Sequence, residues 1–168
     1  MSQLTVICTL VLLGVAALTD WRRGEIPNWL TLPPLLIAPF GWWCMDQLSG
    51  VYFSILGLFG CGLIPYFAFR AGAMGGGDVK LFAALGAING VALGTEMIML
   101  SLFAGVVQTL FVLARQGRLV SCMRNCVWLT TNAFLPKRHR RTIETITLTE
   151  LRLGPAILVG SAFALVLA

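Results

Sequence analysis

The sequence predicts an all-α integral membrane protein with six transmembrane helices, and three observations lead to this prediction. The 168 residues are 58% hydrophobic and only 11% charged, whereas a soluble domain carries about 25% charged residues. The charged residues divide the chain into apolar blocks, and the basic ones gather in alternate connections between the blocks. No linker divides the chain, so we expect residues 1–168 to form a single membrane-embedded domain.

Six apolar blocks are long enough, or nearly so, to be membrane helices. They cover residues 1–19, 26–45, 47–69, 81–95, 97–114 and 153–168. A helix needs about 20 residues to cross about 30 Å of hydrocarbon, so the fourth and sixth blocks are short. Residues 1–19 lack a basic start and a small-residue cleavage site, so we expect a retained helix rather than a signal peptide.

The second block has local signals of its own. Pro27 disfavours helix at the residue before it, and Asn28 is the expected N-cap of the helix that follows. Pro33, Pro34 and Pro39 lie inside the block, so we expect this helix to be kinked.

The distribution of charge gives the expected orientation. Asp46 alone follows the second block and Glu96 alone follows the fourth, whereas all 12 Lys and Arg residues lie in the other connections. The positive-inside rule makes the basic side cytoplasmic and both termini periplasmic. The net charge of +5 is then a topology signal, and we expect no nucleic-acid partner.

A basic segment separates the fifth and sixth blocks. Apolar residues recur in it at helical spacing, at Leu119, Cys122, Met123, Cys126 and Val127. This spacing predicts an interfacial amphipathic helix over 115–135 on the cytoplasmic leaflet. The run KRHRR at 137–141 is expected to bind anionic lipids. Cys122 and Cys126 have poor spacing with His139 for a zinc site, so no metal is expected.

Asp20 and Asp78 are expected at one depth, near the cytoplasmic edge of the membrane. Asp20 ends the first block, and Asp78 stands just before Lys80, where the fourth helix begins. The 15 uncharged residues between Lys80 and Glu96 span only about 22 Å. The start of this helix therefore lies at or below the interface. A carboxylate at this depth is costly unless it faces protein or water, which makes it a candidate functional group.

Two carboxylates in one such site have a defined chemistry. They hold one proton between them, because two negative charges in a medium of low dielectric constant repel each other. The ionised group takes a proton from water while the protonated group polarises a carbonyl. Asp78 is the expected ionised member, because the positive end of its helix favours negative charge. Taken alone, Asp20 or Asp78 would instead be interpreted as a loop charge that caps a helix end.

The residues around Asp78 fit this chemistry. Gly75, Gly76 and Gly77 have no side chains and can adopt positive φ, so they would let an extended peptide approach Asp78 and be held by strand addition. Lys80 is interpreted as an assisting group or, more simply, as a side chain that reaches the lipid headgroups.

Three motifs together resemble those of the type IV prepilin peptidases. DWRRGEIPN (Asp20 to Asn28) resembles their first aspartate motif, and GGGDVK (Gly75 to Lys80) resembles their GxGD motif with its following lysine. GPAI (Gly154 to Ile157) resembles their C-terminal signature.

The resemblance implies a six-helix aspartyl protease of the bacterial inner membrane, with Asp20 and Asp78 as the catalytic pair and no cofactor. It implies a prepilin substrate, a single-span protein whose short basic leader is removed on the cytoplasmic side. The supporting residues drawn from the same motifs are Gly75, Gly76, Gly77, Lys80, Pro27 and Asn28.

The subgroup follows from what the chain lacks. Larger members of the family carry paired CxxC motifs and also N-methylate the new amino terminus, and no CxxC pair is visible in this sequence. The chain resembles the short, peptidase-only form associated with tight-adherence (Flp-type) pili, so no N-methyltransferase activity is expected. Components of the pilus assembly machinery are further candidate partners.

Two alternative functions stay open. One is a GxGD intramembrane protease that cuts other membrane proteins, although the IPN sequence after Asp20 argues against it. The other is a non-enzymatic transporter or scaffold, in which Asp20 and Asp78 relay protons or bind cations.

Overall fold

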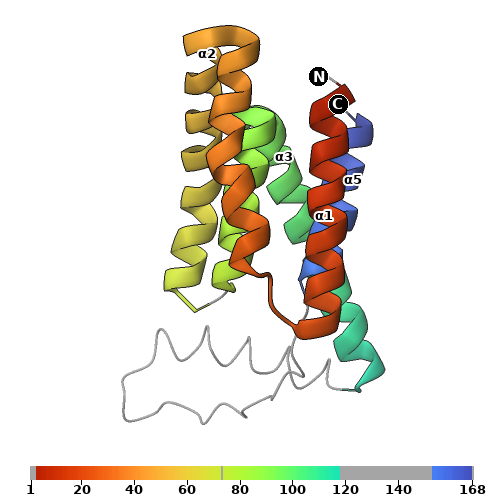
Figure 1. Cartoon of the computed structure of the whole chain (residues 1–168). Helices are drawn as coiled ribbons and strands as arrows, with labels where there is room; N and C mark the ends of the chain where they lie inside the picture. The colour runs from red at the N-terminus through yellow and green to blue at the C-terminus, as the bar shows by residue number, and fades with distance from the viewer. Residues whose placement is uncertain (1–2, 73, 118–152, 168) are drawn as a thin grey trace. The chain divides into compact units, whose positions relative to one another are not determined.

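The computed structural model describes residues 3–72, 74–117 and 153–167, and every regular element in these ranges is a helix (Figure 1). The helices are α1 (Gln3–Arg23), α2 (Asn28–Arg70), α3 (Gly76–Arg115) and α5 (Gly154–Leu167). Three of them, α1, α2 and α3, are long and apolar enough to cross a membrane. The predicted all-α class is confirmed for the described residues, while six membrane crossings stay a prediction.

The chain forms two compact units, Met1–Gly105 with Arg152–Ala168, and Val106–Leu151. In the second unit the structure describes the end of α3 and the turn after it. There the Arg115 guanidinium lies over the ring of Phe111, 4.7 Å from its centroid. From residue 118 on, the predicted interfacial helix lies outside the described residues, as do the basic run at 137–141 and the trio Cys122, Cys126 and His139.

Within the first unit, α2 consists of two helical segments, and the chain reverses between them at Asp46 and Gln47 (Figure 1). Asp46 (φ −127°, ψ 20°) and Gln47 (φ 52°, ψ −130°) have non-helical torsions. The reversal brings the rings of Trp42 and Phe53 to 4.8 Å between centroids, whereas a straight helix would place them about 16 Å apart. The break lies where the sequence predicted a boundary between two apolar blocks.

One local prediction at the start of α2 is wrong. Pro27 (φ −72°, ψ 146°) is the N-cap, and Asn28 is the first helical residue rather than the cap. The backbone torsions stay helical at Pro33, Pro34 and Pro39, so a kink at these residues stays a prediction. The φ angle that the proline ring imposes is itself helical, so these residues can remain in the helix.

The break in α3 corrects a predicted boundary. The non-helical residue is Gly90 (φ 79°, ψ 178°), which occupies a backbone region open essentially to glycine alone. A Cβ placed on Gly94 would lie 3.1 Å from Cα of Gly86, so the chain turns back between them. The sequence placed this boundary at Glu96, which instead lies inside the second segment, because backbone torsion and not charge determines the turn.

Small residues let the segments of the first unit approach closely. Ser54 of α2 donates a hydrogen bond from Oγ to the carbonyl of Ala87 at 2.8 Å. A Cβ on Gly57 would overlap the carbonyl oxygen of Gly86. α1 packs against α5, and Figure 1 shows these two helices side by side and antiparallel.

One end of the first unit collects the helix ends that matter for function. The last turn of α1, the first turn of α3 and the start of α5 lie at this end (Figure 1). The described basic residues of the unit lie at the same end: Arg22 and Arg23 end α1, Lys80 lies near the start of α3, and Arg70 ends α2 (Figure 1). Positive charge therefore gathers at one end of the unit. That this end faces the cytoplasm stays a prediction.

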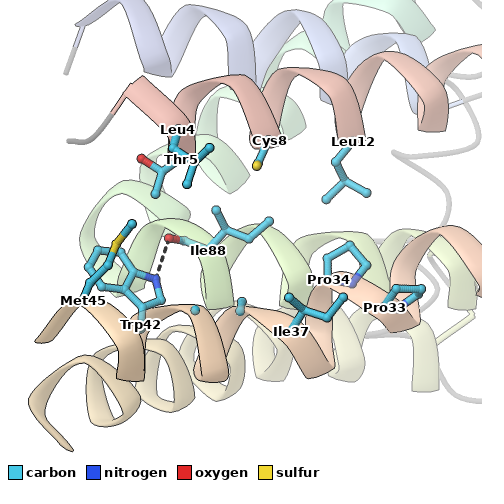
Figure 2. Close-up of a pocket in the computed structure, with 12 residues that line it drawn as sticks. Leu4, Thr5, Cys8, Leu12, Pro33, Pro34, Ile37, Trp42, Met45 and Ile88 are labelled. Atoms are coloured by element: carbon cyan, nitrogen blue, oxygen red, sulfur yellow. Dashed lines mark hydrogen bonds between the residues drawn. The ribbon is translucent and has the colours of Figure 1, made fainter. Parts of the chain in front are cut away.

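An apolar cavity of about 340 Å³ lies between α1 and the first segment of α2 (Figure 2). Leu4 and Leu12 belong to its lining. The indole N–H of Trp42 donates to the carbonyl of Ile88 at 3.1 Å beside it. Its lining contains no carboxyl group, amine or imidazole, and its one thiol is that of Cys8. This cavity therefore lacks the groups needed for acid–base hydrolysis.

Candidate active site

A second cavity, of about 460 Å³, brings the two predicted aspartates together. It is lined by Asp20, Gly24, Glu25, Ile26, Pro27, Asn28, Gly75, Gly76, Gly77 and Asp78. Its walls are the end of α1 with the connection to α2, and the start of α3, so two separate stretches of sequence meet in it. Every predicted site residue except Lys80 is among the lining residues.

Asp20 is held at the end of α1. Its side chain is only 6% exposed. Oδ2 of Asp20 accepts a hydrogen bond from the backbone N–H of Gly154, at 2.7 Å. Hydrogen bonds to a carboxylate are short and strong, so this contact fixes the orientation of the Asp20 side chain.

Asp78 lies in the first turn of α3 and is 9% exposed. Its carboxylate extends back over Gly75, where a Cβ would lie 3.1 Å from Oδ2 of Asp78. The carboxylates of Asp78 and Asp20 are near enough to interact electrostatically. The first turn of α3 favours a negative charge on Asp78. The N–H of Gly154 favours a negative charge on Asp20 in the same way. Which of the two aspartates is ionised therefore stays a prediction, with Asp78 the expected one.

The glycines before Asp78 differ from expectation. Gly76 and Gly77 are the first two residues of α3, and neither they nor Gly75 has a positive φ. An extended edge for strand addition is therefore absent at Gly76 and Gly77. A Cβ on Gly77 would lie 3.0 Å from Cβ and 3.1 Å from the carbonyl oxygen of Ile26. The missing side chain at Gly77 lets the connection between α1 and α2 approach the start of α3.

Lys80 and Asn28 form a contact that the sequence did not indicate. The Nζ of Lys80 donates to Oδ1 of Asn28 at 2.7 Å, on the exposed side of the site. Asn28 therefore serves as an acceptor rather than as a helix cap. The bond joins the second turn of α3 to the first residue of α2, and so links two walls of the cavity.

Two features of the site were missed in the sequence. Glu25, at the exposed rim, adds a third carboxylate to the lining. Gly154 belongs to the GPAI motif, but nothing in its sequence context predicts that its N–H reaches Asp20. Among the described residues no group of three His, Cys, Asp or Glu side chains is placed to hold a metal ion.

The chemistry open to this arrangement follows from its two buried carboxylates. They face one cavity large enough for water and a peptide bond, and one of them has a fixed backbone donor. A carboxylate pair of this kind can act as general base and general acid toward a bound amide.

Comparison with known proteins adds the family. The Type IV leader peptidase family matches residues 7–112, which include both aspartates and the break in α3. Searches of curated proteins and of solved structures found no match.

Proposed function

Since the chain belongs to the Type IV leader peptidase family, we propose that it is a membrane aspartyl endopeptidase that removes the leader of type IV prepilins. The family makes the protein a peptidase, and its long apolar helices are those of a membrane protein. The observation that carries the proposal is the burial of Asp20 and Asp78, from two distant stretches of sequence, in the wall of one cavity.

The proposed reaction takes place at the cytoplasmic face of the inner membrane. A prepilin, anchored by its own apolar helix, brings the junction after its leader into the cavity. One aspartate removes a proton from water, the water oxygen attacks the scissile carbonyl, and the protonated aspartate polarises that carbonyl. The second proton transfer releases the amine, and no acyl-enzyme forms.

The connection between α1 and α2 is proposed to hold the substrate. Its residues Gly24 to Pro27 are not helical and line the cavity. Pro27 is extended, with φ −72° and ψ 146°. The N–H of Gly24 donates to the carbonyl of Asp20, and the carbonyl of Pro27 accepts from Leu30. The backbone groups of Glu25 and Ile26 are therefore the ones proposed to pair with an extended peptide. This connection takes the role that the sequence had assigned to the glycines before Asp78.

Coexpression with a prepilin tests the proposal. Asp20→Asn and Asp78→Asn should each abolish leader removal, because an amide at either position cannot exchange the proton. Asp46→Asn is the matched control, since Asp46 is an exposed aspartate at the break in α2, outside the cavity. Leader loss is read from the size of the pilin on a gel. Substantial processing by either active-site variant would refute the proposal.

The finer assignments are tested with the same strain. We propose Flp-type prepilins as substrates and no transfer of a methyl group. The mass of the mature pilin's amino-terminal peptide reports both the cleaved bond and any added methyl group. A competing single-span protein unrelated to pilins should remain intact, and its cleavage would favour a GxGD intramembrane protease of broader specificity.

A further inference from the structure

The start of α5 meets Asp20 at a distance that leaves no room for a side chain. Gly154 is buried, and its N–H donates to Oδ2 of Asp20 at 2.7 Å. A Cβ on Gly154 would lie 2.6 Å from Cβ and 2.7 Å from Oδ2 of Asp20. Cβ atoms essentially never approach other heavy atoms so closely, so the hydrogen bond in this geometry requires glycine.

Gly154 is the first residue of α5, so its N–H has no hydrogen-bond acceptor within the helix. Pro155 has no N–H and tends to occupy the first turn of a helix, where the backbone donors have no partner in the helix. The N–H of Ile157 already donates to the carbonyl of Leu153 at 2.9 Å. The N–H of Gly154 is therefore free of the helix and points at the carboxylate instead.

We propose that Gly154 is a positioning residue for the hydrolysis. Its N–H holds Oδ2 of Asp20 and leaves Oδ1 for the water and the proton that the aspartates exchange. This inference rests on the proposed function, because it assigns Gly154 a role through Asp20. The catalytic step depends on the orientation of Asp20, and substrate binding does not.

The position of α5 does not depend on Gly154. Ser101 of α3 donates from Oγ to the carbonyl of Ile157 at 3.3 Å, and its hydroxyl lies 3.2 Å from that of Ser161. Further along α5, a Cβ on Gly160 would overlap the backbone of Ser101. Removal of the hydrogen bond at Gly154 should therefore leave α5 in place.

Replacement of Gly154 by glycolic acid tests the proposal, because it exchanges the N–H for an oxygen and changes no side chain. The full chain is made by cell-free synthesis into lipid nanodiscs, and the rate of prepilin cleavage is measured per folded protein. We expect kcat to fall by about 10- to 100-fold. KM should stay within about twofold of the parent value, since the N–H of Gly154 orients Asp20 and is not proposed to contact the substrate.

Glycolic acid at Gly160 is the matched control. It removes one backbone donor from the same helix, away from Asp20, and should leave kcat close to that of the parent. Equal losses of kcat at the two positions, or a parent-like kcat with glycolic acid at Gly154, would overturn the proposal.

Gly154→Ala gives a second test of the same contact, and Asp20→Asn serves as the inactive reference. Gly154→Ala is measured in cells against Gly14→Ala, whose Cβ would meet no atom within 4 Å. Gly154→Ala should lose more processing for the same amount of folded protein, and equal processing by the two variants would overturn the proposal. Asp20→Asn should be inactive in both assays. An active Asp20→Asn would refute the proposed function itself, which is a different outcome from a parent-like rate without the Gly154 donor.

Discussion

At the scale of residues, the site combines two carboxylates whose side chains are held by different contacts. Asp20 has a backbone donor from a helix that begins far along the sequence, whereas Asp78 depends on its own helix start and on Gly75. Both are nearly enclosed, at 6% and 9% exposure. The charge of a carboxylate is costly to bury, so two buried carboxylates in the wall of one cavity are unusual in a purely structural role.

Lys80→Met should weaken catalysis modestly. The bond from Nζ to Oδ1 of Asn28 joins two walls of the cavity. Exposed hydrogen bonds and charge contacts contribute about 0.5–1.5 kcal/mol, so we expect kcat/KM to fall by about 2- to 10-fold. Asn28→Ala should cause a similar loss, and the double variant should lose little more than either single one. Arg70→Met, which removes a positive charge from the end of α2, is the control. Additive losses at Lys80 and Asn28 would contradict this account.

At the scale of elements, the breaks in α2 and α3 determine which helix faces meet. The break at Asp46 and Gln47 was predictable, since a charged residue interrupts a long apolar stretch there. The break at Gly90 was assigned to the wrong residue. Asn89 and Gly90 form a dipeptide typical of turns, and that signal outweighs the charge of Glu96, which a helix can tolerate.

The candidate site shows a similar division between what was predictable and what was not. Asp20 and Asp78 could be paired in advance, because the positions of charges along the chain place both at one membrane edge. The contact of Gly154 with Asp20 could not, since it depends on how α1 and α5 pack. The contact between Gly77 and Ile26 could not be predicted either. A glycine indicates that another segment can approach closely, but which segment approaches depends on the packing of the helices.

Gly90→Ala should destabilise the protein by about 2–4 kcal/mol, because an alanine there has a disfavoured torsion and its Cβ overlaps the ring of Phe53. Gly41→Ala is the control. A Cβ at Gly41 meets no atom within 4 Å, and alanine favours a helix by about 0.5–1 kcal/mol over glycine. Unfolding in SDS measures both variants, and a Gly90→Ala protein as stable as the parent would contradict the described turn.

At the scale of the whole molecule, the few charged residues of this apolar chain gather at particular places. Within the first unit the described basic residues lie at the end that holds the dyad cavity, and Asp46 lies at the reversal of α2. The large exposed side chains of α1, α2 and α3 are mostly apolar, as expected for surfaces that face lipid. The positive-inside rule then predicts that the cavity opens on the cytoplasmic side.

Cysteine labelling tests this orientation. In a background without native cysteines, Ser49→Cys, next to the break in α2, should react with an impermeant maleimide in cells whose outer membrane alone is permeabilised. Ala71→Cys, at the end of α2, should react only after the inner membrane is opened. Both positions are exposed in the structure. The reverse pattern of labelling would contradict the predicted topology.

The central claim is that Asp20 and Asp78 act as one catalytic unit, and the cleavage rates of purified single and double variants test it most directly. We predict that Asp20→Asn and Asp78→Asn each reduce kcat/KM by at least about 10³-fold. The double variant should be no slower than the slower single one, because residues that act as a unit are non-additive. A single variant that keeps a rate within about tenfold of the parent, or losses that multiply in the double variant, would contradict the account.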